Sequence, residues 1–388
     1  MTDRPRLLYL ITEDWYFWSH RLDLARLAAQ AGFDVSIATR VTDHGERIRR
    51  EGFRLFPITL YRRSRNPFVE LGAVLELVRL YRRERPTIVH HVALKPILYG
   101  SIAAWCSRVP VVVNAFAGLG YAFTDQKRRA GLLHMCLRHA LRVLLKLRRS
   151  LVVFQNQDDR DLLVEKDVVA LPQTRIIPGS GIDTKVFDIR LPSPDDSVVM
   201  LASRMLWDKG VGDFVEAVRH LKRDGVSARF VLVGRCDEHN PAAIEPDQIH
   251  LWVREGLVEW WGHREDMAAT LALASIVVLP SYREGLPKVL LEAAACGKPL
   301  VAADVPGCRD IVTHGVNGLL VPVRNPSALA AAINSLLRDP SLGIAMGLAG
   351  RQTVVRRFSV EQVANQTVEL YRELLIKTGI RTPTAGLA

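Results

Sequence analysis

Several features that define other classes of protein are scarce in this chain. Its five cysteines are scattered and include no C-x-x-C pair, so neither a disulfide framework nor a zinc ribbon is expected, and a reducing cytosol is the default compartment. No apolar run reaches the length of about 18 residues that a membrane-spanning helix needs. The apolar start, Met1 to Ile11, meets acidic residues too early for a signal peptide. The sequence therefore predicts a protein that is not integral to a membrane, although it can sit on one.

Acidic residues are also scarce, but only in the front half of the chain. Residues 1–190 carry 31 basic and 19 acidic side chains, whereas residues 191–388 carry 21 and 22. No acidic residue lies between Asp125 and Asp158. The basic residues that gather there are Lys127, Arg128, Arg129, Arg138, Arg142, Lys146, Arg148 and Arg149.

Leucines at near-helical spacing run through the same stretch, from residue 131 to residue 153. Basic and apolar side chains can thus occupy different faces of one helix, and such a helix can lie on anionic lipid. A core helix with a solvated basic face explains the pattern equally well. A nucleic-acid groove is disfavoured, because no recognisable nucleic-acid module accompanies the charge.

Length and composition leave room for two ordinary domains. The chain has 388 residues, of which 48% are hydrophobic and 24% charged, and this excludes disorder and small disulfide scaffolds. Short β-rich runs alternate with helical patterns from end to end, which predicts parallel sheets covered by helices. The runs that we interpret as strands are Leu7–Ile11, Phe33–Thr39, Thr87–Val92, Val111–Asn114, Val198–Ala202, Arg229–Val233, Leu257–Trp261, Ile276–Leu279 and Pro299–Ala302.

Helix signals and a linker complete the expected organisation. One helix is capped by Ser19 and ended by Gly32, and another begins at Asn66–Pro67. The polar, proline-bearing residues 189–196 are typical of an interdomain linker. We expect an α/β protein with two doubly wound domains in tandem, over residues 1–188 and 197–360. A helix over 361–377 can cross back to the first domain, and 378–388 form a disordered tail.

In doubly wound sheets, ligands bind at the carboxyl ends of the strands. The second domain gathers cations, glycines and a carboxylate at those positions, in Ser203–Arg204, Gly234–Arg235, Gly262–His263–Arg264 and Ser281–Gly285. Arg204 and Lys209 flank the start of a helix, where a guanidinium, an ammonium and free amides suit a diphosphate. As an isolated pattern, an arginine and a lysine five residues apart are more often only solvated.

Glu284 and Glu292 form a more specific pattern, with Gly285 and Pro287 marking a tight turn between them. If most of the intervening residues are helical, roughly 12 Å separates the carboxylates. A general acid and a nucleophile that flank one bond stand about 5 to 10 Å apart, so this pair fits two parts of a long ligand instead. A nucleotide diphosphate sugar has that layout. The alternative is one surface carboxylate and one core-edge carboxylate that caps amides.

At this point the chain resembles a known family. Residues Tyr282–Ala303, followed by Gly307 and by Asn317–Pro322, are similar to the signature of the retaining group 1 glycosyltransferases of family four. Members have the GT-B fold, which consists of two Rossmann-like domains. The resemblance implies that Arg204 and Lys209 neutralise the donor diphosphate. It further implies that Glu284 holds hydroxyls of the transferred sugar and that Glu292 holds the ribose. The remaining donor-binding candidates are Gly285, Leu286, Gly234 and His263.

Shorter strings narrow the resemblance to bacterial enzymes that add an N-acetylhexosamine to a polyprenyl-diphosphate-linked saccharide. These strings include Ser64–Phe68, Gly118–Gly120, Leu206–Gly210 and Val233–Pro241. The resemblance implies a UDP-sugar donor, a lipid-linked acceptor, an anionic inner membrane surface as a partner, and no nucleic acid. The location expected is cytoplasmic, peripheral to the inner face of the plasma membrane. The nucleotide sugar is a substrate, and no cofactor is expected.

Two departures from the family concern the first domain. Many members have a glycine-rich loop after the first strand, but this chain has bulky aromatics between Glu13 and His20, which cannot approach phosphates as closely. We interpret this segment as serving the acceptor, although packing of two of the four aromatics on a neighbouring helix is also expected. Many members also have a histidine where this chain has Ala117. The acceptor-binding candidates are Trp15, Tyr16, Trp18, His20, Lys95, Gly118 and Gly120. Phe17 is a weaker acceptor candidate, and His90 is a candidate for contact with the transferred sugar.

The family's same-face substitution needs no carboxylate nucleophile, and electrostatic stabilisation of the leaving diphosphate is its main requirement. No metal is expected, because His and Cys do not cluster. Asp159 and Asp161, in the first domain, are interpreted as a solvated helix start. Two alternatives remain open: a nucleotide-sugar epimerase of the same fold, and an inactive scaffold that binds nucleotide or membrane.

Overall fold

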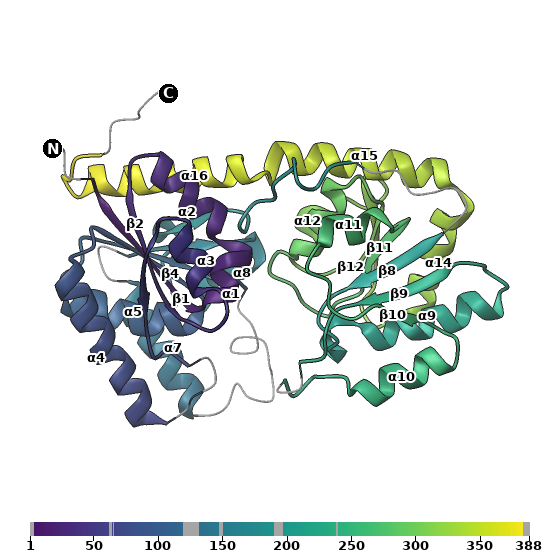
Figure 1. Cartoon of the computed structure of the whole chain (residues 1–388), viewed down its shortest axis with the longest axis horizontal. Coiled ribbons are helices and arrows are strands. Elements are labelled where there is room, and N and C mark those ends of the chain that lie inside the picture. Colours follow the sequence, from purple (N-terminus) through teal and green to yellow (C-terminus); the bar gives the residue numbers. More distant parts are fainter. Residues whose placement is uncertain are drawn as a thin grey trace. The chain divides into compact units, whose positions relative to one another are not determined.

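The computed structural model describes residues 4–61, 64, 66–118, 132–146, 150–189, 197–237 and 240–382. These residues form two compact units. Unit 1 comprises residues 1–181 together with 360–388, and unit 2 comprises residues 182–359. Each unit is an α/β sandwich built on a parallel sheet (Figure 1).

Unit 1 is built on a seven-stranded sheet with strand order β3-β2-β1-β4-β5-β6-β7. Its strands are β1 (Arg6–Glu13), β2 (Asp34–Arg40), β3 (Arg54–Pro57), β4 (Ile88–Val92), β5 (Val111–Ala115), β6 (Ser150–Phe154) and β7 (Thr174–Ile176). Its helices are α1 (Asp14–His20), α2 (Leu22–Gln30), α3 (Gly45–Arg50), α4 (Pro67–Glu84), α5 (Leu94–Cys106), α7 (Leu132–Leu145), α8 (Gln157–Glu165) and α16 (Val360–Lys377), with a 3-10 turn η1 (Leu171–Gln173).

Side-chain alternation along β1 explains how the layers of unit 1 form. Leu7, Tyr9 and Ile11 face one side and join the apolar cluster of α2 and α16, whereas Leu8 and Leu10 face the other side and pack with α4 and α5. Both clusters are buried because helices cover both faces of the sheet (Figure 1).

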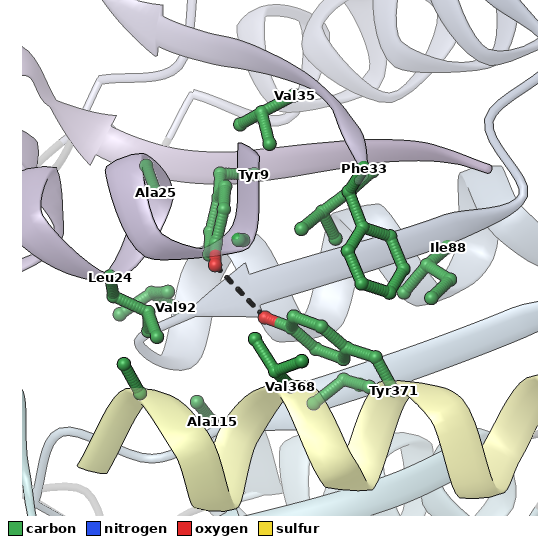
Figure 2. Close-up of a cluster of buried hydrophobic side chains, with 14 of the residues drawn as sticks. Tyr9, Leu24, Ala25, Phe33, Val35, Ile88, Val92, Ala115, Val368 and Tyr371 are labelled. Atoms are coloured by element: carbon green, nitrogen blue, oxygen red, sulfur yellow. Dashed lines mark hydrogen bonds between the residues drawn. The ribbon is translucent and has the colours of Figure 1, made fainter. Parts of the chain in front are cut away.

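Helix α16 brings a polar contact into its cluster. The hydroxyl oxygens of Tyr9 on β1 and Tyr371 on α16 lie 3.0 Å apart in the buried interior (Figure 2). The last helix of the chain is therefore an integral part of unit 1. Gly379 and Ile380 close the end of α16 through backbone bonds to Ile376 and Leu375, so the prediction of a disordered tail is wrong for these residues; 383–388 lie outside the described part.

Unit 2 is built on a six-stranded sheet with strand order β10-β9-β8-β11-β12-β13. Its strands are β8 (Val198–Ala202), β9 (Arg229–Val233), β10 (Glu259–Trp260), β11 (Ile276–Leu279), β12 (Leu300–Ala303) and β13 (Gly318–Val321). Its helices are α9 (Val211–Arg223), α10 (Pro246–Arg254), α11 (Met267–Ala272), α12 (Lys288–Ala295), α13 (Cys308–Ile311), α14 (Pro326–Arg338) and α15 (Pro340–Arg357), with a 3-10 turn η2 (Trp207–Lys209).

The division between the units falls after Gly181, earlier than the boundary predicted at residue 188. Ile182 is buried in unit 2 and bridges to Ser359. Arg351 on α15 donates hydrogen bonds to the carbonyl oxygens of Thr184 and Phe187. Residues 182–188 are thus tied to unit 2 by contacts with residues far along the chain, which no local signal reveals.

Two predicted helices differ from the observed ones. The first helix does not begin at Ser19, because the chain turns helical directly after β1. Asp14 holds this turn by accepting hydrogen bonds from the backbone N–H groups of Thr42 and His44, and Ser19 lies inside α1, where its hydroxyl donates to the carbonyl oxygen of Trp15. The basic helix ends at Leu145, and residues 150–153, predicted to continue it, belong to the buried strand β6.

Candidate active site

The crossover point of the unit 2 sheet lies between β8 and β11, the strands from which the chain proceeds in opposite directions. A doubly wound sheet opens a crevice at this point, beyond the carboxyl ends of the two strands. Residues that follow β8 include Arg204 and Lys209, and those that follow β11 include Glu284. Three of the sequence-predicted donor residues therefore follow the two strands at the crossover point.

Lys209 and Glu284 form the central contact of the site. The Lys209 Nζ atom lies 2.5 Å from Oε1 of Glu284, and 21% and 10% of the two side chains are exposed. Lys209 ends η2, directly before Gly210, whose positive φ of 72° turns the chain into α9. A Cβ atom on Gly210 would overlap the carbonyl oxygen of Pro280. The glycine thus lets the loops after β8 and β11 come close enough for the ion pair.

Arg204 pairs with a different carboxylate, that of Asp237. Its Nη1 atom lies 2.9 Å from Oδ2 of Asp237, in the segment after β9, and 44% of its side chain is exposed. Between these segments lies Gly234, with φ 141°, where a Cβ atom would overlap the carbonyl oxygen of Ser203. Gly234 also accepts a hydrogen bond from the indole nitrogen of Trp260. It therefore brings the ends of β8 and β9 into close contact.

Glu292 lies inside α12, and 6% of it is exposed. Burial raises the pKa of its carboxyl group, and the Lys288 ammonium, 3.1 Å away, partly opposes this effect. Helix α12 begins at Lys288, so the residues directly after Glu284 form a turn and those from Lys288 to Glu292 are helical. Leu286 packs on the core of unit 2.

Gly285 and His263 are the remaining donor-binding candidates. The carbonyl oxygen of Gly285 is the atom that a Cβ on Gly307 would overlap, so the turn before α12 and the start of α13 are in close contact. His263 follows β10 and is exposed.

Sequence reasoning missed several partners in unit 2. Asp237 is separated from Arg204 by 33 residues and has no local signal. Lys288 could have been found, because it stands four residues before Glu292 on a helix. Tyr282 also belongs to a small cluster. The Arg324 guanidinium lies over the Tyr282 ring at 4.7 Å, and burial and the nearby Asp213 raise the pKa of Tyr282.

The acceptor candidates of unit 1 have diverse surroundings. Trp15 is 36% exposed. Tyr16 and Trp18 pack partly against the core, and the weaker candidate Phe17 is fully buried there. His20 stacks on Tyr16 with ring centroids 4.3 Å apart.

Lys95 and His90 are engaged in structural contacts. The Lys95 ammonium donates to the carbonyl oxygens of Tyr61 and Ser64 and lies 2.8 Å from Glu70, so it holds the segment before α4. His90 is buried and bonded through Nδ1 to Tyr371. Gly118 has a positive φ of 101°, and Gly120 lies outside the described residues.

Of the basic residues predicted to contact a membrane, Arg138 is exposed on α7. Arg142 and Lys146 both pair with Asp167, and Lys127, Arg128 and Arg129 lie outside the described residues. None of the described helices is long and apolar enough to cross a membrane. Asn156 caps α8 by accepting a hydrogen bond from the backbone N–H of Asp159. Asp159 is buried there, so it is not solvated as predicted. In the described part of the chain, no three His, Cys, Asp or Glu side chains are grouped to hold a metal ion.

Comparison with known proteins identifies the family. A family model described as "Glycosyl transferases group 1" matches residues 196–339, and one described as "Glycosyl transferase 4-like" matches residues 6–156. The chain belongs to the group 1 glycosyltransferases. Enzymes of this class transfer sugars, and the group 1 match covers most of unit 2.

Relatives of this group 1 glycosyltransferase include two bacterial enzymes. It is 27% identical over 357 residues to the N,N'-diacetylbacillosaminyl-diphospho-undecaprenol alpha-1,3-N-acetylgalactosaminyltransferase of Campylobacter jejuni. The match covers 88% of this chain and 92% of that protein. It is 23% identical over 362 residues to the UDP-Gal:alpha-D-GlcNAc-diphosphoundecaprenol alpha-1,3-galactosyltransferase of Escherichia coli, covering 89% and 90%.

Solved structures show that the glycosyltransferase has the predicted GT-B fold. The sucrose-phosphate synthase of Thermosynechococcus elongatus matches with a TM-score of 0.78 at 22% identity, over 96% of this chain and 100% of that one. Anabaena Alr3699/HepE in complex with UDP matches with a TM-score of 0.74 at 19% identity, over 95% and 100%.

Proposed function

We propose that this enzyme transfers an N-acetylhexosamine from a UDP-sugar to a saccharide linked to polyprenyl diphosphate, with retention of configuration and without a metal ion. The observation that carries the proposal is the Lys209–Glu284 pair at the crossover point of unit 2. The names of the Campylobacter and Escherichia coli relatives support the acceptor class, and the UDP complex of the Anabaena protein supports the donor class.

Each donor-side residue has a distinct task in this proposal. An ammonium has three N–H donors, and Lys209 uses one of them on Glu284 in the described structure. The others can bind the donor diphosphate, together with the Arg204 guanidinium. Glu284, fixed by Lys209, accepts hydrogen bonds from hydroxyls of the transferred sugar, and Glu292 accepts them from the ribose.

The reaction proceeds by substitution on one face of the sugar. The bond between the anomeric carbon and the diphosphate oxygen breaks, and its electron pair stays on the diphosphate. An oxygen of the departing diphosphate takes the proton of the acceptor hydroxyl, whose oxygen then bonds to the anomeric carbon on the same face. Lys209 and Arg204 stabilise the negative charge that develops on the leaving group, which is the main contribution of the protein to catalysis.

Because both cations are supplied by side chains, we expect turnover to survive chelation. Activity in EDTA equal to activity in magnesium supports this part of the proposal. Loss of turnover in EDTA and its return with magnesium contradicts it.

Peripheral attachment to an anionic inner membrane is part of the same proposal, because the acceptor is lipid-linked. Two exposed surfaces of unit 1 support it. Helix α7 presents Arg138, and helix α4 presents Phe68, Leu71 and Leu75 on one stripe, with exposed fractions of 83%, 58% and 45%. Exposed apolar side chains gain free energy by entering a lipid interface, and exposed basic ones gain it near anionic headgroups.

Vesicle flotation tests this attachment. The Phe68→Ser, Leu71→Ser double variant is expected to bind phosphatidylglycerol vesicles more weakly than the parent, whereas substitution of the exposed Leu251 in unit 2 by serine is expected to leave binding unchanged. Equal flotation of all three proteins contradicts a role for α4.

A donor screen read by mass spectrometry tests the reaction itself. The purified enzyme is incubated with a panel of UDP- and GDP-sugars and a short polyprenyl-diphosphate saccharide, and a mass increase of one N-acetylhexosamine on the lipid is expected only with the matching UDP-sugar. Conversion of the donor without acceptor supports an epimerase instead. Nucleotide binding without any conversion supports a scaffold.

A further inference from the structure

A small pocket in unit 1 combines two buried side chains that the proposed reaction does not use. Arg21 precedes α2, and His90 lies on β4; 4% and 2% of these residues are exposed. Both line the same pocket together with Phe116, Gln155 and Thr367. The volume of the pocket is about 10 Å³, which suits a group the size of one water molecule or one oxygen atom.

The positive charge of Arg21 is not compensated by a neighbouring carboxylate. Its Nη1 atom donates to the carbonyl oxygen of Gly179 at 3.1 Å, but its buried Nε atom has no hydrogen-bond partner. Within the described residues, no acidic side chain pairs with it. A buried guanidinium normally has an anionic partner, because an unpaired buried charge is costly.

His90 supplies a second unpartnered nitrogen to the pocket. Tyr9, Tyr371 and His90 form a buried chain, with 3.0 Å between the two hydroxyl oxygens and 2.5 Å from the Tyr371 hydroxyl to Nδ1 of His90 (Figure 2 shows the two tyrosines). Burial and the nearby Arg21 charge lower the pKa of His90 well below its usual range, so the ring is neutral. When the tyrosines donate along this chain, the ring proton resides on Nε2, which has no partner.

The pocket lies at the ligand-binding edge of the unit 1 sheet. Phe116 directly follows β5 and Gln155 directly follows β6, so the pocket is at the carboxyl ends of these strands. Arg21 itself directly follows α1, the aromatic helix after β1. Arg21 and His90 both line the pocket, so a ligand bound along this edge would lie beside both residues.

We infer that the pocket binds one anionic oxygen of a diphosphate group, which accepts hydrogen bonds from Nε of Arg21 and Nε2 of His90. A water molecule can satisfy both N–H groups but cannot balance the guanidinium charge. Since this inference rests on the proposed function, the diphosphate is that of the lipid-linked acceptor. Arg21 then anchors the acceptor, whereas Lys209 and Arg204 of unit 2 bind the donor.

Thermal-shift titrations at constant ionic strength test the assignment. Inorganic diphosphate and a short polyprenyl diphosphate are titrated in saturating UDP, which occupies the donor crevice. Both are expected to raise the Tm of the parent protein. In Arg21→Met the affinity for both is expected to fall about 30-fold or more, because one partner of a buried charged pair is lost. A gain with the prenyl compound alone indicates recognition of the lipid and contradicts the diphosphate assignment.

Arg26→Met is the matched control. Arg26 stands on the same helix and pairs with Glu51 at the surface, so its variant loses the same charge but is expected to bind diphosphate normally. Equal losses in both variants, or no Tm rise in the parent protein, overturn the inference. If Arg21→Met does not fold, Arg21→Lys is used: it keeps the charge without the Nε donor, and affinity equal to the parent overturns the inference.

The UDP arm separates this inference from the proposed function. UDP alone is expected to raise the Tm of the parent and of Arg21→Met equally. If UDP stabilises neither protein, the proposed donor site fails, while the comparison between the two variants still decides the diphosphate pocket.

Discussion

Replacing Glu284 by glutamine is expected to separate nucleotide binding from sugar transfer. In the described structure the Glu284 carboxylate lies 2.5 Å from the Lys209 ammonium, and the two side chains are 10% and 21% exposed. The same ammonium is proposed to bind the donor diphosphate. The carboxylate therefore competes with the diphosphate for Lys209 and also repels it.

The size of this competition follows from Coulomb's law. If the Glu284 carboxylate and the donor diphosphate are treated as two unit charges roughly 6 Å apart, they repel each other by about 3 kcal/mol at an effective dielectric constant of about 20. Solvent reaches both side chains, and the glutamine oxygen keeps a weaker hydrogen bond to Lys209. We therefore reduce the gain in UDP binding to about 1 kcal/mol, or about 5-fold in Kd. Turnover is expected to fall about 100-fold, because the amide replaces a charged acceptor of the sugar hydroxyls.

Calorimetric titration with UDP and a mass-spectrometric transfer assay measure the two effects on one preparation. Glu245→Gln, at an exposed site in unit 2, is the control and is expected to change neither value. Weaker UDP binding in Glu284→Gln, in proportion to its loss of turnover, refutes the competition. It indicates instead that the carboxylate is needed to hold Lys209 in place.

Three further predictions concern stability. Gly234→Ala is expected to destabilise unit 2 by about 3 kcal/mol or more, because its φ of 141° is unfavourable and the new Cβ overlaps a carbonyl oxygen; Gly225→Ala, with positive φ in open space, is expected to cost about 1 kcal/mol in the same thermal unfolding assay. Burial raises the pKa of Glu292 above 4.5, so the folded protein binds this proton more tightly than the unfolded chain does. The stabilisation that results is present at low pH and is lost as the pH rises through the folded-state pKa. Glu292→Gln is therefore expected to gain stability relative to the parent as the pH rises from 4.5 through the folded-state pKa of Glu292, and a pH-independent difference contradicts the shift. Tyr371→Phe is expected to cost about 2 kcal/mol in chemical denaturation, since it leaves Nδ1 of His90 buried without its partner; a loss below about 0.5 kcal/mol indicates that the hydroxyl chain is not needed.

The sequence was sufficient for the two-domain plan because buried strands are continuous apolar runs. Val198–Ala202 and Ile276–Leu279 were predicted with the bounds that the structure has. Strand β3 was missed because its four residues, Arg54–Pro57, are short and partly exposed, so they lack an apolar signature. Strand β6 was assigned to a helix because it follows a leucine-rich basic segment without a break in composition.

The site was predictable as a set of residues but not as a set of contacts. Lys209 and Glu284 were each singled out, yet 75 residues separate them and only the sheet topology brings them together. Arg21 carried no signal, because an arginine at the start of a helix is common on solvated surfaces. Only its burial and its lack of an acidic partner distinguish it.

The return of α16 to unit 1 has a consequence for how the polypeptide matures on the ribosome. Residues 182–359 of unit 2 are continuous, so this unit can complete its core once its last helix has left the ribosome. Unit 1 cannot, because Val363, Val368 and Tyr371 belong to its core and come from α16, which is translated after unit 2. Nascent chains therefore expose the apolar face of α2 until translation reaches α16. A chain that ends before residue 360 would keep every residue of the unit 2 core but would lack the part of the unit 1 core that α16 supplies.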